Sequence, residues 1–157
     1  METPQPLNPA EESMWRSLTF LLNHLLRNLD AALVGETGVS VSQYVVLVHL
    51  SEATGNELRI GELASACNLS ASRISRLIDT MERSGEVTKH EAPNDGRSVV
   101  VRLTADGLAT LQRAYPTQLA SVRRLVFDQL DDVDVAALSE ALGRVRRGIE
   151  RTTGGAP

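Results

Sequence analysis

The sequence predicts a mainly α-helical fold that carries a small β-hairpin, and two patterns indicate it. Along most of the 157 residues, apolar side chains recur every three or four positions, which is the spacing of amphipathic helices. Residues 87–103 instead alternate apolar and polar side chains around a cluster of turn-forming residues, as a hairpin does. The length suits one domain, or one domain with helical arms.

The first helix is expected over residues 8–35, after a flexible N-terminus at 1–7. Asn8 can cap its start, with Glu11 in the first turn, and Gly35 is the expected end. Its apolar residues follow helical spacing: Trp15, Leu18, Leu22, Leu25, Leu26 and Leu29.

A helix-turn-helix is predicted after a further helix at roughly 41–53. Ser40 and Gln43 form a capping-box pattern at the start of that helix. A short helix at 61–67 is then joined by a tight turn to a helix that Ser70 caps. Its apolar face consists of Ile74, Leu77, Ile78 and Met81. Two short helices joined by such a turn make a helix-turn-helix.

The alternating segment is expected to form a β-hairpin directly after this motif. Strands at 87–91 and 99–103 flank turn-forming residues at 92–96. A hairpin in this position forms a wing, so residues 40–103 are predicted to be a winged helix-turn-helix domain.

Two more helices are predicted after the wing. Thr104 caps a long helix, and Pro116 should kink it. Asp131 or Asp132 caps the last helix, and a disordered tail is expected at 152–157.

The first and last helices carry long apolar stripes outside the winged domain. A compact monomer could fold these stripes inward, but a dimer buries them more simply, and a two-fold protein would match a two-fold DNA site. We therefore expect residues 8–35 and 104–151 to form a helical dimerisation region, with a second copy of the chain as partner.

The predicted helix from Ser70 has a polar face opposite its apolar one. A helix in the major groove reads base edges through its N-terminal residues. Four polar side chains lie there: Ser70, Ser72, Arg73 and Arg76. Arg can bond guanine O6 and N7, while Ser hydroxyls suit phosphates. The alternative is an ordinary solvated helix face, and the net charge of −4 counts mildly against nucleic-acid binding.

The turn of the hairpin carries the triplet Asp95-Gly96-Arg97. The Asp95 carboxylate can hold the Arg97 side chain extended, and an extended Arg at a wing tip fits a narrow minor groove. The alternative is a surface ion pair worth about 0–1 kcal/mol. The position of the triplet, directly after a helix-turn-helix, favours the DNA-binding interpretation.

The run from Leu63 to Thr104 resembles the core of MarR-family transcriptional regulators. Its most specific part is Asp95-x-Arg97 followed by Arg102-Leu103-Thr104. The resemblance implies a homodimer on a pseudo-palindromic operator in double-stranded DNA, and a repressor that a small ligand or oxidation releases. It also implies DNA contacts by Ser70, Ser72, Arg73, Arg76, Asp95 and Arg97. In the first wing strand, Lys89 comes later than the basic residue of many relatives, which leaves backbone contacts there open.

The resemblance also implies a small-molecule effector pocket between the dimer helices and the winged domain. Four side chains come from the helices that line it in relatives: Trp15, Phe20, His24 and Tyr44. The alternative for each is packing in the core or the interface. Cys67, the one cysteine, is more typical of a small buried side chain than of a redox sensor.

Other functions lack their motifs. The three His side chains fall on different predicted elements, so neither a metal site nor a cofactor is expected. No catalytic motif is present and no apolar run is long enough to span a membrane. We expect a cytoplasmic DNA-binding repressor, not an enzyme, that responds to a small ligand such as an aromatic or phenolic compound. The alternative is a winged-helix protein-interaction module without DNA binding, which would not need aligned arginines.

Overall fold

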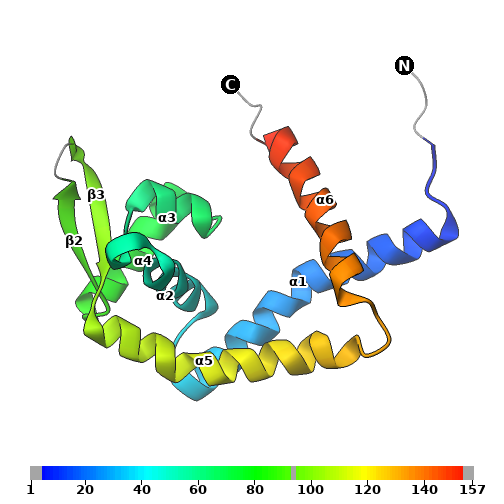
Figure 1. Ribbon diagram of the computed structural model, residues 1–157, viewed down its shortest axis with the longest axis horizontal. Helices are drawn as coiled ribbons and strands as arrows, with labels where there is room; N and C mark the ends of the chain where they lie inside the picture. The colour runs from blue at the N-terminus through cyan, green and yellow to red at the C-terminus, as the bar shows by residue number, and fades with distance from the viewer. Residues whose placement is uncertain (1–4, 93–94, 154–157) are drawn as a thin grey trace. The chain divides into compact units, whose positions relative to one another are not determined.

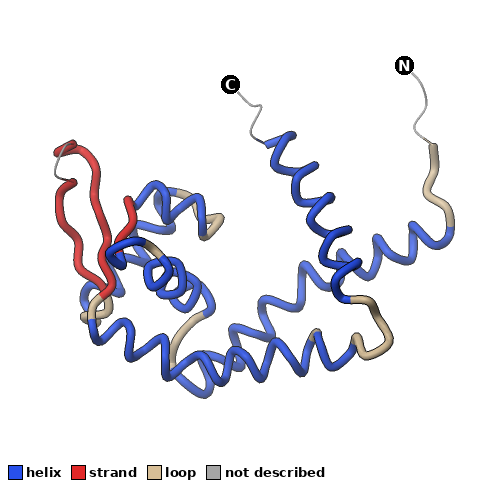
Figure 2. Tube along the Cα trace, in the orientation of Figure 1, coloured by secondary structure: helices blue, strands red, loops and turns tan. Residues whose placement is uncertain are grey.

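A computed structural model describes residues 5–92 and 95–153 of the chain, with the backbone alone at 92, 95–98 and 153. The elements occur in this order: α1 (Pro9–Thr37), α2 (Val41–Glu52), β1 (Glu57–Arg59), α3 (Ile60–Ala66), α4 (Ala71–Arg83), β2 (Val87–Ala92), β3 (Asp95–Leu103), α5 (Ala105–Leu125) and α6 (Val135–Thr153) (Figure 1). Short 3₁₀ turns lie at Thr54–Asn56 and Phe127–Gln129. The fold is mainly helical with one small sheet (Figure 2), which confirms the predicted fold class.

The sheet has three antiparallel strands in the order β1-β3-β2. In β2 and β3, Val87 faces Leu103 and Lys89 faces Val101, while β1 pairs with the other side of β3. The short segment Glu57–Arg59, just before the helix-turn-helix, is therefore a strand of the sheet. Because β2 pairs on one side only, its free side is an edge.

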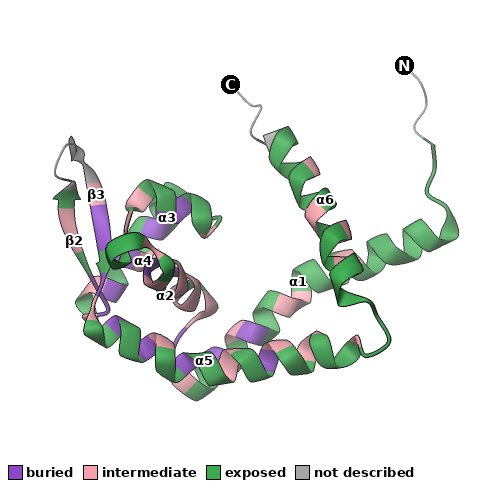
Figure 3. Ribbon diagram, in the orientation of Figure 1, coloured by how far each residue is buried: buried purple, intermediate pink, exposed green. Residues whose placement is uncertain are grey.

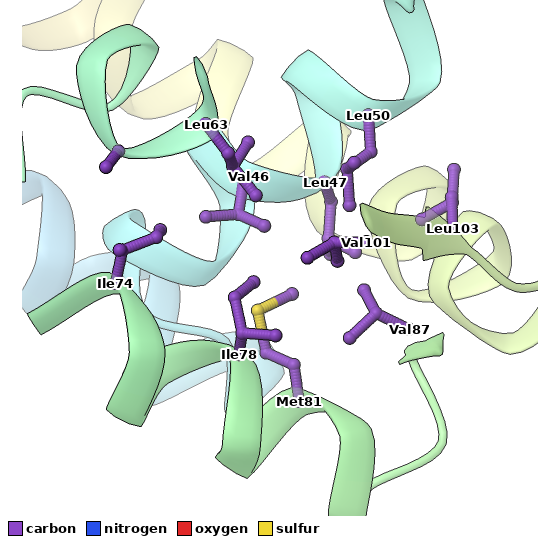
Figure 4. Packing of buried hydrophobic residues seen from close by; sticks show 11 residues of the cluster. Val46, Leu47, Leu50, Leu63, Ile74, Ile78, Met81, Val87, Val101 and Leu103 are labelled. Atoms are coloured by element: carbon purple, nitrogen blue, oxygen red, sulfur yellow. The ribbon is translucent and has the colours of Figure 1, made fainter. Parts of the chain in front are cut away.

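The core of the winged domain is made by aliphatic side chains from α2, α3, α4 and the sheet (Figure 4). The labelled residues are Val46, Leu47, Leu50, Leu63, Ile74, Ile78, Met81, Val87, Val101 and Leu103. Burying each such side chain contributes roughly 1.5–3 kcal/mol. Since α4 supplies three of these residues from one face, the core fixes which face of α4 meets solvent.

The end of α1 differs from the prediction. Gly35 lies inside the helix, and the helix ends at Gly38, which has a left-handed φ of 74° and donates from its backbone N–H to the Val34 oxygen. The side chain of Asp30 accepts a hydrogen bond of 2.8 Å from the Val41 N–H, so α1 also supports the first turn of α2. The predicted Ser40 capping box is present.

Two other boundaries are also corrected. Strand β3 begins at Asp95, so the backbone of Arg97 is in a strand where the sequence predicted a tip next to a turn. Asp134 caps α6 by accepting from Ala136 and Ala137, in place of the expected Asp131 or Asp132. The helix then continues to Thr153, into the tail expected to be disordered, and residues 154–157 lie outside the described part.

Residues 1–121 and 122–157 form two compact units. Buried residues concentrate in the winged domain and the adjoining parts of α1 and α5 (Figure 3), whereas none lies in the first half of α1 or in α6 over residues 135–152, for which burial is described. Over 5–92 and 95–153, no single helix is long and apolar enough to cross a membrane; α1 and α2 together pass that test by length and composition, with a bend of 83° between them.

Candidate nucleic-acid interface

Helix α4 follows a tight turn after α3. Asn68 takes a left-handed φ of 52° there, and the Leu69 N–H donates to the Ala64 oxygen at 2.9 Å. Asn is one of the few residues that tolerate this conformation. The turn therefore sets the angle at which α4 leaves α3, while Ile74 and Ile78 anchor its inner face in the core.

The outer face of α4 carries the four predicted contact residues, and all four are exposed: Ser70, Ser72, Arg73 and Arg76. The hydroxyls of Ser70 and Ser72 lie 3.3 Å apart, and the Arg76 Nε donates to the backbone carbonyl oxygen of Ser72 at 3.2 Å. The structure thus brings these side chains onto one surface. Ser70 holds the N-cap position, yet its side chain makes no capping hydrogen bond.

A shallow pocket of about 220 Å³ adjoins this surface. Ser42 in the first turn of α2 lines it together with Arg73 and Arg76, above Leu69 and Leu77. Ser42 could not be predicted from the sequence, because its place beside α4 depends on how α2 packs and no local motif marks it. Two arginines and a serine beside one shallow pocket suit an anionic oxygen group such as a phosphate.

The wing has fewer described candidate DNA contacts than α4 has. The backbone of Asp95 and Arg97 lies in β3, but their side chains fall outside the described part, so the predicted pairing between them stays a prediction. Lys89 on β2 forms ion pairs with two carboxylates of α4, with Nζ–O distances of 2.6 Å to Asp79 and 2.8 Å to Glu82. Hydrogen bonding to these carboxylates raises the pKa of Lys89.

The four candidate effector residues do not gather at one place within the chain. Phe20 and His24 stack on α1 with ring centroids 4.1 Å apart, and Trp15 is exposed on the same helix. Tyr44 packs instead against the cluster that contains Leu33 near the other end of α1. At 1.5 Å per residue, Trp15 and Leu33 are about 27 Å apart along the helix axis.

Tyr44 does line a cavity of about 400 Å³ between α2 and α5. The cavity is lined by Tyr44, Val48, Ser51, Glu52, Leu111, Gln112 and Tyr115. Burial, and secondarily the neighbouring Tyr115, raises the pKa of Tyr44, so its hydroxyl stays protonated and can donate a hydrogen bond at neutral pH. Only one of the four predicted residues belongs to this cavity.

The described residues provide no cluster of metal ligands, and the one thiol is partly buried. Over 5–92 and 95–153, no three His, Cys, Asp or Glu side chains lie close enough together to hold a metal ion. Cys67 is half-buried against the winged-domain core, and burial raises the pKa of its thiol.

Comparison with known proteins places this architecture in a family. The sequence profile of the MarR family matches residues 37–98. The MarR-family transcriptional regulator AbsC of Streptomyces coelicolor is 31% identical, the match covering 94% of this chain and 99% of AbsC with a TM-score of 0.84. The chain belongs to the MarR family.

Two further proteins are similar to this chain over most of their own length. Sco3205 of S. coelicolor, whose crystal structure contains DNA, is 31% identical over 98% of this chain and 97% of its own, with a TM-score of 0.88. The transcriptional repressor YetL of Bacillus subtilis is 26% identical over 79% of this chain and 74% of YetL. The chain is thus a MarR-family transcriptional regulator, and regulators of this family are not enzymes.

Proposed function

We propose that this MarR-family regulator is a homodimeric repressor that binds a pseudo-palindromic DNA operator through α4 and the wing. The observation that carries the proposal is the outer face of α4, where Ser70, Ser72, Arg73 and Arg76 are all exposed opposite the buried face. The DNA present with the similar Sco3205 supports DNA as the partner.

The contacts divide by chemistry. The two arginines of α4 read guanine edges or bind phosphates beside Ser42, and the two serines bind phosphates at the start of α4. On the wing, Arg97 enters the minor groove, and the Asp95 carboxylate orients the Arg97 side chain. These assignments rest on exposure and position for α4, and on sequence for the wing.

The deciding experiment is a footprint on the DNA that flanks the gene for this protein, followed by binding measurements over a range of salt concentrations. R73A and R76A should each weaken operator binding by about 1–3 kcal/mol if they read guanine, with a smaller loss on random DNA. R97A should weaken binding and reduce the slope of log affinity against log salt concentration by about the contribution of one phosphate contact, or less.

R102A provides a matched control, because Arg102 on β3 is an exposed arginine paired with Glu57 on β1 and is not among the proposed DNA contacts. It should bind as the wild type does. Equal losses on operator and random DNA would make Arg73 or Arg76 a phosphate contact only. A wild-type protein that protects no DNA would contradict the whole proposal and favour a protein-interaction module.

We infer an effector site at the cavity between α2 and α5. Its volume of about 400 Å³ suits a small aromatic molecule, and its lining combines Leu111 and Val48 with two tyrosines. The carboxylate of Glu52 also lines it, which disfavours anionic ligands. We assign Trp15, Phe20 and His24 to the surface that the second chain covers.

A panel of neutral phenols and aromatic acids tests this site by release of bound operator DNA. Phenols should release the DNA at lower concentration than the corresponding acids, and Y44F should weaken the response while leaving DNA affinity unchanged. Release by acids alone, or a response that Y44F leaves intact, would place the effector elsewhere.

A further inference from the structure

Lys89 links the first wing strand, β2, to α4. Its Nζ lies 2.6 Å from an oxygen of Asp79 and 2.8 Å from an oxygen of Glu82. Its backbone N–H donates to the other Glu82 oxygen at 3.2 Å. We call these three residues the Lys89 clamp. Glu82 thus holds both the backbone and the side chain of one strand residue.

The clamp occupies a particular place in the domain. Asp79 and Glu82 are three residues apart on α4, so their side chains lie on the same side of the helix. β2 pairs with β3 on one side only, and Val87 anchors its start in the core. Two residues further along β2, the Lys89 clamp holds the strand against α4.

The charges of the clamp matter for a neighbouring polyanion. One ammonium group balances two carboxylates, whose side chains are 56% exposed in Asp79 and 38% exposed in Glu82, while that of Lys89 is only 30% exposed. Without Lys89, the C-terminal half of α4 would present two uncompensated carboxylates close to the proposed DNA surface. An ammonium has three donors, and two of them are already engaged by carboxylates.

We propose that Lys89 is a positioning residue for DNA recognition, one that neutralises Asp79 and Glu82 and holds the wing strand against α4, and not a ligand of a DNA phosphate. This inference rests on the proposed function. It assigns a role to a basic residue of the first wing strand, where sequence reasoning left phosphate contacts open.

The test compares three variants on one DNA fragment that the wild type binds. K89M should weaken binding roughly 3- to 30-fold, and the loss should shrink at higher salt, which screens the repulsion between the DNA and the two carboxylates. K89E should weaken it further, since three carboxylates would then meet. The charge swap K89E/E82K restores an ion pair across the same gap and should return affinity to within about threefold of wild type.

R102M is the matched control. Arg102 on β3 pairs with Glu57 on β1 at 2.6 Å, so its loss removes a sheet cation and an ion pair without touching α4. It should change DNA affinity less than twofold. Thermal unfolding of each variant, followed by circular dichroism, shows that the comparison is made between folded proteins.

The outcomes separate the two proposals. If the charge swap K89E/E82K folds but does not restore binding, Lys89 is a direct phosphate ligand and the positioning role is overturned. If K89M binds as the wild type does, the clamp has no role in recognition. If the wild type itself binds no DNA, the proposed function fails, and the inference fails with it.

Discussion

Cys67 illustrates how one side chain's surroundings decide its chemistry. It ends α3, where its N–H donates to the Leu63 oxygen at 2.9 Å and its side chain packs on the winged-domain core. Because burial raises the thiol pKa, less thiolate is present at neutral pH than in an exposed cysteine, and the thiolate is the reactive form. This environment favours the packing interpretation over the redox one.

We expect iodoacetamide to modify Cys67 slowly in the native protein at pH 7.5 and rapidly in guanidinium chloride. Mass spectrometry of the time course measures both rates. C67S should bind DNA as the wild type does. Native and denatured rates that agree would show an accessible, reactive thiol and reopen a sensor role.

Glu57 gives a residue-scale prediction about pH. Arg102 donates to one Glu57 oxygen from Nε at 2.8 Å and from Nη2 at 2.6 Å, and this hydrogen bonding lowers the Glu57 pKa from its ordinary 4.5. A carboxylate with a lowered folded-state pKa contributes stability above its unfolded pKa and loses that contribution as the pH falls through the folded value.

E57Q should therefore melt below wild type at pH 7, and the gap in Tm should close as the pH falls below 4.5, where the carboxylate takes up a proton. Melting curves at pH 7, 5, 4 and 3 at one protein concentration provide the measurement. A gap in Tm that persists unchanged at pH 3 would show that the effect of E57Q is not electrostatic.

At the scale of elements, two glycines of α1 are distinguished by backbone conformation alone. A Cβ at either Gly35 or Gly38 would meet no atom within 4 Å, but Gly38 has a φ of +74° and Gly35 is helical. G35A should stabilise the protein by roughly 0.5–1 kcal/mol through helix propensity. G38A should destabilise it by about 1–2 kcal/mol, because an L-residue disfavours the left-handed region.

Chemical denaturation of the two variants at matched protein concentration tests this pair, with each serving as the control for the other. The expectation from sequence was the reverse, with Gly35 as the helix end. Destabilisation by G35A together with tolerance of G38A would support that original boundary over the one observed.

These glycines also show what sequence could and could not predict. Where one unambiguous local pattern was present, the sequence predicted the structure correctly, as with the Ser40 capping box and the buried helix face around Ile78. Where two or three similar residues compete within a few positions, as Asp131 and Asp134 do at the start of α6, the sequence did not identify the residue that caps the helix. The Lys89 clamp depends on how β2 lies against α4, so no sequence pattern could indicate its partners.

At the scale of the whole molecule, the main unexplained feature of a single chain is exposed apolar surface. On α1, Met14, Trp15, Phe20, Leu22 and Leu26 are each more than half exposed. On α6, the same holds for Leu142, Val145 and Ile149, and no described residue of that helix is buried. Stripes of this size on two helices are typical of surfaces that another protein covers. A second copy is the partner that the proposed two-fold operator requires.

We therefore expect L142E and V145E to convert a dimer into monomers in sedimentation equilibrium, because either change would bury a carboxylate in an apolar interface. A136E is the matched control, since Ala136 is exposed and lies on the opposite side of α6 at helical spacing. Operator affinity should fall roughly 100-fold or more in the two monomeric variants, because each half-site would then bind alone, and should be unchanged in A136E. Dimers that survive both changes would remove α6 from the interface and leave α1 as the candidate, whereas a monomeric wild type would require another explanation for both apolar stripes.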